Sequence, residues 1–149
     1  MTYRDVFGEI LADHHESPRN FGCMADADRV EKGYNPLCGD KVNICLKVSE
    51  HGEKIEKCMF EGEGCSICMA SASILTEMVS GKKRVEALRL IEAFREKMQG
   101  VENVADLPAD DAEEDIVALY GIKRFPVRIK CALLAWTTLK KGLEAVPHA

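Results

Sequence analysis

The chain has 149 residues, of which 46% are apolar and 30% charged, and its formal net charge is −5. These values fit one globular domain over residues 1–149, and they exclude the concentrated basic patch that a nucleic-acid partner requires. Because no apolar run reaches membrane-spanning length and the N-terminal stretch lacks the apolar core of a signal peptide, we expect a cytoplasmic protein with no membrane partner.

The hydrophobic spacing predicts a helix at the start of the chain and a small sheet after it. Apolar residues recur with helical spacing over residues 3–11, and Pro18 closes this helical segment. Apolar and polar residues then alternate over residues 41–48, which is typical of a half-buried strand. We expect residues 54–60 to pair with this strand as a hairpin. A shorter edge strand near residues 27–34 would complete an antiparallel sheet of about three strands.

The second half of the chain is predicted to be helical. After Gly64 the pattern favours a helix that ends at Gly81, where a C-cap glycine belongs. Residues 82–99 predict an amphipathic helix. Its apolar stripe consists of Val85, Leu88, Ile91, Phe94 and Met98. A short helix near residues 112–120 and a final helix over residues 126–142 follow, so strands come first and helices after. This order predicts an α+β fold, with the sheet packed against several helices.

Seven cysteines are many for a chain of this length. They stand at positions 23, 38, 45, 58, 65, 68 and 131. Their odd number and the expected reducing compartment argue against a disulfide framework, which leaves metal ligation, thiol chemistry or burial as small apolar side chains. Cys45 and Cys58 fall on facing predicted strands, where they could be neighbours across the hairpin. Together with Cys23 they are expected to be packing residues.

Cys38 lies in the motif NPLCGD, whose Asn35, Pro36 and Gly39 predict a loop between two strands. Asp40 follows two residues later, so both side chains can point at one ion. Alternatively, Asp40 is an ordinary turn residue and Cys38 is a free thiol. The spacing alone leaves both interpretations open.

Cys65 begins the motif CSIC, residues 65–68, at a predicted junction between strand and helix. Backbone N–H groups and the helix dipole at such a junction favour a thiolate, although a small residue packed in the first turn would fit the pattern too. A thioredoxin-like pair would need parallel strands, which the chain does not supply. A closed zinc ribbon would need a second close cysteine pair, and the sequence contains none.

Cys131 lies near the start of the last predicted helix, where Arg128 and Lys130 flank it. These two residues can favour a thiolate or contact a partner, or they can be plain solvated side chains. The alternative is a buried position on the apolar stripe of that helix. This stripe would consist of Val127, Cys131, Leu134 and Thr138. His14 and His15, at the end of the first helix, are expected to be surface residues.

Three motifs in this order resemble those of the U-type iron–sulfur cluster assembly proteins (NifU N-terminal-like). They are NPLCGD around Cys38, GEGCSICMAS around Cys65 and RIKCALLAW around Cys131, and PRNFG at residues 18–22 also matches. The chain is more similar to the SufU branch than to the IscU branch. The helical stretch at about 82–125 resembles the SufU insertion, and a lysine precedes the third cysteine where IscU-like proteins carry a histidine.

The resemblance implies a SufU/IscU-like α+β fold with one Zn2+ ion held by Cys38, Asp40, Cys65 and Cys131. It also implies a SufS-type, pyridoxal-phosphate-dependent cysteine desulfurase as partner. Cys38 would then be the sulfur acceptor, and a downstream iron–sulfur scaffold would receive the sulfur. Such a protein is a sulfurtransferase-like relay rather than a stand-alone enzyme.

Three alternative functions remain open at this point. The chain could be a scaffold that assembles a 2Fe–2S cluster, or binds iron, with the same four ligands. It could be a thiol redox protein that uses Cys65 and Cys68, or a structural zinc module that docks a partner. Cys68 departs from the family, in which serine is usual at this position. We expect it to be inert, but it could compete for metal or form a disulfide with Cys65.

Overall fold

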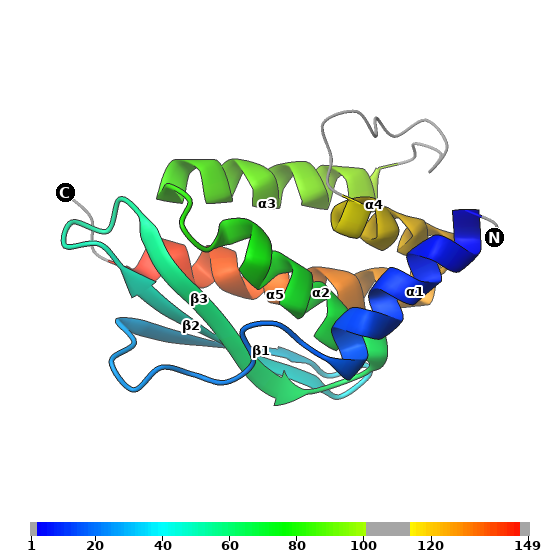
Figure 1. Ribbon diagram of the computed structural model, residues 1–149, viewed down its shortest axis with the longest axis horizontal. Helices are drawn as coiled ribbons and strands as arrows, with labels where there is room; N and C mark the ends of the chain where they lie inside the picture. The colour runs from blue at the N-terminus through cyan, green and yellow to red at the C-terminus, as the bar shows by residue number, and fades with distance from the viewer. Residues whose placement is uncertain (1–2, 101–113, 147–149) are drawn as a thin grey trace.

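The computed structural model describes residues 3–100 and 114–146, and the side chains of residues 8–100 and 115–146 (Figure 1). One helix precedes a three-stranded sheet, and the remaining helices follow the sheet. The elements are α1 (Tyr3–Glu16), β1 (Arg29–Asn35), β2 (Asp40–Val48), β3 (Ile55–Glu63), α2 (Ser66–Val79), α3 (Arg84–Gln99), α4 (Glu114–Tyr120), the 3-10 helix η2 (Gly121–Arg124) and α5 (Pro126–Ala145). The predicted α+β fold is confirmed.

The three strands form one antiparallel sheet in the order β1-β2-β3. The alternation predicted in β2 is confirmed on one face, where Val42, Ile44 and Leu46 are fully buried. At the β1–β2 hairpin the register pairs Asn35 with Asp40. β3 continues past the predicted end of its strand to Glu63, which brings the chain directly to the CSIC motif.

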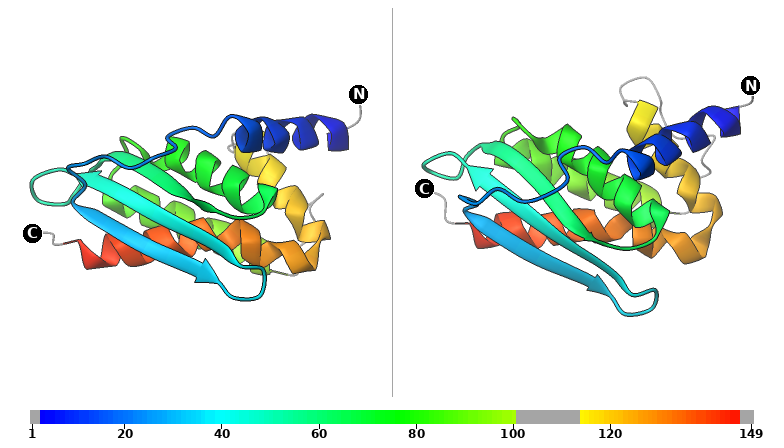
Figure 2. Two further views of the ribbon diagram at one scale, coloured as in Figure 1. Left: turned by 90° about the horizontal axis from the view of Figure 1, so that it is seen from below. Right: turned by 60° about the horizontal axis from the view of Figure 1, so that its bottom comes forward.

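The helices gather on one face of the sheet (Figures 1 and 2). α2 packs on β3, and α5 packs on β1 and β2. α3 lies against α5, while α1 contacts α2 and α4. At the centre of these helices the Trp136 and Phe94 rings stack with centroids 4.0 Å apart. The hydrophobic core therefore lies between the sheet and α2, α3 and α5.

The connection from α1 to β1 runs along the sheet (Figure 2). Gly22 N–H donates to Phe60 O at 2.7 Å, which ties the connection to β3. Asp28 N–H donates to Leu46 O at 2.8 Å, which ties it to β2. Between these two points Cys23 forms a disulfide with Cys45.

The disulfide corrects two predictions about the cysteines. Cys23 and Cys45 are expected to be packing residues, but they are bonded to each other. Cys45 is fully buried although it lies on the strand face away from the helices. Cys45 and Cys58 are not neighbours across the hairpin, because the register pairs Cys45 with Met59 and Cys58 with Leu46. Successive residues of a strand point to opposite faces, so Cys58 lies on the helix side.

The helix predictions are confirmed in outline and corrected in two side chains. Gly81 follows α2 with φ +85°, as expected for a C-cap glycine. Val85 and Val127, which the spacing assigns to apolar stripes, are 56% and 87% exposed. In α3 the buried position of the first turn belongs to Arg84, whose guanidinium donates to Val146 O at 3.2 Å, and Val85 lies outside the buried face.

Some sequence predictions fall outside the described residues. Residues 112–113 of the short helix are among them, and the helical insertion at about 82–125 is described only at its two ends. None of the helices in the described part of the chain combines the length and hydropathy needed to cross a membrane.

Candidate metal centre

Four residues from three distant segments meet at one end of the sheet. The Sγ atoms of Cys38 and Cys131 are 3.7 Å apart, and Cys65 Sγ lies 3.5 Å from Asp40 Oδ2. The ligand atoms of Cys38, Asp40 and Cys131 all lie within 4.8 Å of one another. Three of the four residues that the resemblance selected thus lie within 4.8 Å of one another, and Cys65 joins them through its contact with Asp40.

Cys38 is held in the turn of the β1–β2 hairpin. Asn35 organises this turn, because its side-chain oxygen accepts a hydrogen bond from Leu37 N–H at 3.1 Å and its carbonyl accepts one from Gly39 N–H at 2.8 Å. Gly39 has φ +77°, a conformation that glycine adopts without strain. Cys38 is exposed, and Leu37 beside it is 79% exposed.

Asp40, the first residue of β2, is the buried carboxylate of the site, with 2% exposure. Its Oδ1 accepts a hydrogen bond from Cys65 N–H at 2.9 Å. Burial alone would raise the pKa of Asp40. Hydrogen bonds from the Cys38 thiol, the Cys65 N–H and the Cys131 and Cys65 thiols outweigh burial and hold this pKa below its ordinary value. The carboxylate is therefore ionised before any metal arrives.

Cys65 is the N-cap residue of α2, as the motif predicted, and its Sγ accepts a hydrogen bond from Cys68 N–H at 3.4 Å. The Cys68 side chain is fully buried in the core, and neither thiol is in a disulfide. Burial, followed by the negative charges of Asp40, Cys65 and Cys38, raises the pKa of the Cys68 thiol. These observations argue against a redox pair of Cys65 and Cys68, because a buried protonated thiol is a poor nucleophile.

Cys131, near the start of α5, is 2% exposed. Burial, and then hydrogen bonds to Asp40, Cys65 and Cys38, raise the pKa of this thiol. The Arg128 guanidinium lies against the Cys131 and Cys65 sulfurs, and its own pKa is raised first by the hydrogen bond to Cys131. Arg128 therefore faces the thiol cluster, whereas sequence reasoning left its role open between thiolate stabilisation and plain solvation.

The donor set has a clear chemical preference. Three sulfurs and one carboxylate oxygen form a tetrahedral set that suits zinc, or iron of a small iron–sulfur cluster. A metal that binds here must displace the proton of Cys131, so binding should release protons. Asp40 needs no such displacement because its pKa is already low. The residues present therefore fit a thiophilic divalent metal.

Exposed apolar side chains flank Cys38 and Cys131 in the chain, and we call these side chains the rim of the site. Leu37 precedes Cys38, while Phe125 and Val127 precede Cys131 and are 58% and 87% exposed. A shallow pocket adjoins this rim between β1 and α5, and Lys130 lines it. Its other lining residues are Tyr34, Asn35, Pro36, Leu133, Leu134 and Thr137. Exposed apolar residues around reactive groups favour contact with another protein.

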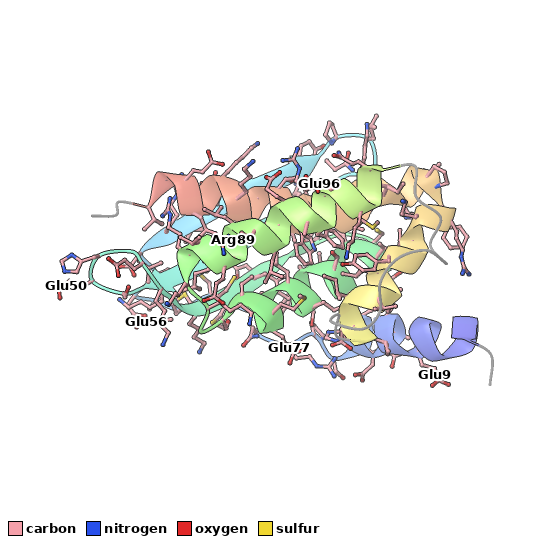
Figure 3. All side chains as sticks on the ribbon, turned by 90° about the horizontal axis from the view of Figure 1, so that it is seen from above. Glu9, Glu50, Glu56, Glu77, Arg89 and Glu96 are labelled. Carbon is pink, nitrogen blue, oxygen red and sulfur yellow. A yellow bond between two sulfur atoms is a disulfide. The ribbon has the colours of Figure 1, made fainter. Side chains whose placement is uncertain are left out.

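A second polar cluster lies away from the thiols, and sequence reasoning missed it. His14 is 2% exposed; its Nδ1 lies 2.7 Å from Ser73 Oγ and its Nε2 lies 2.9 Å from Asp115 Oδ2. Glu77 Oε1 is 3.8 Å from the same nitrogen, and Figure 3 shows Glu77 on α2 beside α1 and α4. The expectation that His14 is a surface residue is wrong, whereas His15 is exposed as expected. The signal was available, since His14 follows Ile10 by four residues on the apolar face of α1.

Comparisons with known proteins identify the family of this chain. The family model of the NifU-like N-terminal domain matches residues 6–148. The zinc-dependent sulfurtransferase SufU of Bacillus subtilis is 41% identical over 140 residues, which cover 93% of this chain and 89% of SufU. The iron–sulfur cluster assembly scaffold protein IscU of Streptococcus pyogenes is 39% identical over 144 residues, which cover 97% and 86% of the two chains.

A solved structure also agrees in fold. It is the crystal structure of FiSufU from Fervidobacterium islandicum AW-1, which is assigned to the SUF system of iron–sulfur cluster assembly. It superposes with a TM-score of 0.79 at 32% identity, and the match covers 95% of this chain and 99% of FiSufU.

Proposed function

Because the chain belongs to the NifU-like N-terminal domain family, which comprises the SufU and IscU proteins of iron–sulfur cluster assembly, we propose that it is a zinc-dependent sulfur acceptor. In this proposal Cys38 takes persulfide sulfur from a SufS-type cysteine desulfurase and passes it to a downstream iron–sulfur scaffold. The 41% identity to a zinc-dependent sulfurtransferase supports this choice within the family.

The observation that carries the proposal is the unequal exposure of the three thiols. Cys38 is exposed, Cys65 is partly buried and Cys131 is buried. Only the first can meet a large donor without rearrangement of the helices. The turn around Cys38 also has room to move, because a Cβ added to the neighbouring Gly39 would meet no atom within 4 Å.

The transfer step itself needs no external oxidant. The Cys38 thiolate attacks the outer sulfur of the donor persulfide, and a sulfur–sulfur bond to Cys38 forms. The bond between the two donor sulfurs breaks, and the donor thiolate leaves with the electron pair. Cys38 then carries one persulfide, and the donor thiol is regenerated.

The residues of the site fit zinc, which Cys38, Asp40, Cys65 and Cys131 would hold. When bound, the metal supplies a positive charge that keeps the thiols deprotonated at neutral pH. Asp40 contributes an oxygen ligand that is already ionised. The Arg128 guanidinium against Cys131 and Cys65 adds a second positive charge that would stabilise thiolates in the cluster.

The apolar rim provides a surface on which the desulfurase would dock. Leu37, Phe125 and Val127 are exposed beside Cys38 and Cys131. Burial of such side chains drives most protein–protein association. Lys130, beside the same rim, would contribute to the choice of partner through its charge.

The test is a desulfurase assay with a SufS-type enzyme, in which sulfide release from cysteine is measured with and without this protein. We expect stimulation by the wild-type chain and none by Cys38→Ser. When the wild-type protein is isolated after this assay, mass spectrometry should show one extra sulfur on the peptide that contains Cys38.

Cys68→Ser is the matched control, because its thiol is buried and outside the proposed ligand set. The Cys68→Ser variant should stimulate the desulfurase as strongly as the wild type does. If Cys38→Ser stimulates the desulfurase as well as the wild type does, the proposed role of Cys38 is wrong.

The second candidate is a scaffold on which a 2Fe–2S cluster is assembled with the same four residues. The 39% identity to an iron–sulfur cluster assembly scaffold protein favours it. Metal analysis of anaerobically purified protein separates the two candidates. Zinc without iron supports the sulfur relay, whereas iron and acid-labile sulfide in equal amounts support the scaffold.

A further inference from the structure

Cys23 and Cys45 form a thiol pair that the proposed sulfur transfer does not use. They are joined in a disulfide across 22 positions of sequence, with Cα atoms 5.7 Å apart. The Cys38, Cys58, Cys65, Cys68 and Cys131 side chains are all free thiols. The structure therefore separates one oxidised pair from the thiols of the metal centre.

The pair is also separated from the metal centre in space. Cys45 lies five residues along β2 from Asp40, which is about 17 Å at the usual rise of a strand. Asp40 shares the face of Val42 and Ile44 that the helices cover, whereas Cys45 points to the opposite face. Chemistry at Cys23 and Cys45 therefore does not draw on the ligand thiols.

The two sulfurs of the pair differ in access from solvent. Cys23 is exposed on the connection between α1 and β1, whereas Cys45 is fully buried beneath it. A small reactant can reach the sulfur of Cys23 first. Cys45 can then react only with the sulfur that lies directly over it.

Hydrogen bonds at both ends of the α1–β1 connection hold Cys23 close to Cys45. Upstream, Phe60 N–H donates to Asn20 O at 3.0 Å and Gly22 N–H donates to Phe60 O at 2.7 Å. Downstream, Val48 N–H donates to the Asp28 carboxylate at 2.9 Å. These contacts do not depend on the disulfide. After reduction they would keep the thiols close, which gives ring closure a high effective concentration.

We propose that Cys23 and Cys45 form a thiol–disulfide exchange site for low-molecular-weight disulfides of the glutathione type. The Cys23 thiolate attacks one sulfur of the small disulfide, forms a mixed disulfide and releases one small thiol. Cys45 then attacks the Cys23 sulfur, the bond from Cys23 to the small thiol breaks, and the departing thiolate takes up the proton of Cys45. The two protein thiols are oxidised by two electrons, and the small disulfide is reduced to two thiols.

The experiment uses the full chain as purified, with its metal, after reduction and removal of the reductant. Oxidised glutathione is added, the reaction is quenched by acid and alkylation, and peptides are mapped by mass spectrometry. We expect the wild type to gain a Cys23–Cys45 crosslink, to lose two hydrogens and to retain no glutathione at either residue. Reduction with dithiothreitol should restore both thiols.

Two variants test the order of the steps. Cys45→Ser should stop at the mixed disulfide and retain one glutathionyl group on Cys23. Cys23→Ser should leave Cys45 unmodified, because the buried thiol cannot be reached. Cys58→Ser is the matched control, since this fully buried thiol lies outside the pair and its removal should leave the crosslink unchanged. Cys45→Ala serves as a second version if the serine variant fails to fold.

Three results would overturn the proposal. One is a wild-type protein that keeps glutathione on Cys23 and never forms the crosslink. Another is a Cys23→Ser variant that takes up glutathione on Cys45 as fast as the wild type reacts. The third is a wild-type crosslink that joins metal-centre cysteines while Cys23 and Cys45 stay reduced.

Discussion

Gly64 shows how an absent side chain positions the Asp40 carboxylate. A Cβ placed on Gly64 would lie 2.9 Å from Asp40 Oδ1 and 3.1 Å from its carboxyl carbon. The next residue, Cys65, donates its N–H to the same oxygen. The Asp40 carboxylate therefore packs directly against the backbone of Gly64, at the point where β3 passes into α2. The orientation of the carboxylate depends on this close approach.

We therefore expect Gly64→Ala to displace the Asp40 carboxylate and weaken metal binding. Loss of support for a ligand typically lowers metal affinity by about 10–100-fold. Competition with a chromophoric zinc chelator measures the change. Gly121→Ala is the control, because a Cβ there meets no atom within 4 Å. Equal zinc affinity in the Gly64→Ala and wild-type proteins would refute the dependence.

His14 acts at the scale of the helices, where it links α1 to α2 and α4. Its imidazole is buried and lies within hydrogen-bond distance of Ser73 on α2 and Asp115 on α4. Ser73 Oγ also accepts the N–H of Arg19, which fixes the chain just after α1. α4 leads through η2 into α5, which carries Cys131. His14 therefore helps to hold the helices that present the third cysteine.

Replacement of His14 by alanine should lower the free energy of unfolding by about 1–3 kcal/mol, because it leaves buried hydrogen-bonding groups without a partner. Urea unfolding measures the change. His15→Ala is the matched control, since the neighbouring histidine is exposed and its removal should have little effect. If both variants lose the same stability, the buried contacts of His14 do not hold the helices.

Helices and strands could be predicted from the hydrophobic pattern where one face of the element is buried in the core. The alternation in β2 and the helical spacing in α3 locate both elements because one side of each is buried in the core. The pattern could not predict the burial of Cys45, because a loop rather than a helix or strand covers it. The exposure of Val127 was equally unpredictable, since nothing local shows that the first turn of α5 projects beyond the core.

The site was predictable from its motifs but not from its spacing. The resemblance selected Cys38, Asp40, Cys65 and Cys131, and the structure brings these residues together. The local sequence places Arg128 near Cys131, but whether its guanidinium faces the sulfurs depends on how α5 is rotated against α2.

At the scale of the whole molecule, the candidate metal centre joins the β1–β2 hairpin, the start of α2 and the start of α5. A ligand that binds only the folded chain stabilises it in proportion to the logarithm of its concentration. The proposed zinc should therefore raise the unfolding temperature. At a free zinc concentration a thousandfold above Kd the gain is roughly 4 kcal/mol.

Thermal unfolding of metal-free protein at increasing zinc concentrations tests this expectation. The midpoint should rise steadily for the wild type and for Cys58→Ser, whose fully buried thiol lies outside the site. The midpoint of the Cys131→Ser variant should rise much less, because this variant lacks one sulfur of the site. A midpoint that does not respond to zinc in the wild type would contradict the proposed stabilisation.

The long separation between Cys38 and Cys131 has a consequence for biosynthesis. The two sulfurs lie 3.7 Å apart but 93 positions apart in sequence, and the second is carried by the last helix of the fold. On the ribosome the hairpin and α2 emerge long before α5 does. A nascent or prematurely terminated chain therefore holds Cys38, Asp40 and Cys65 without their fourth partner. The proposed metal site is thus complete only once α5 has been synthesised and has docked on the sheet.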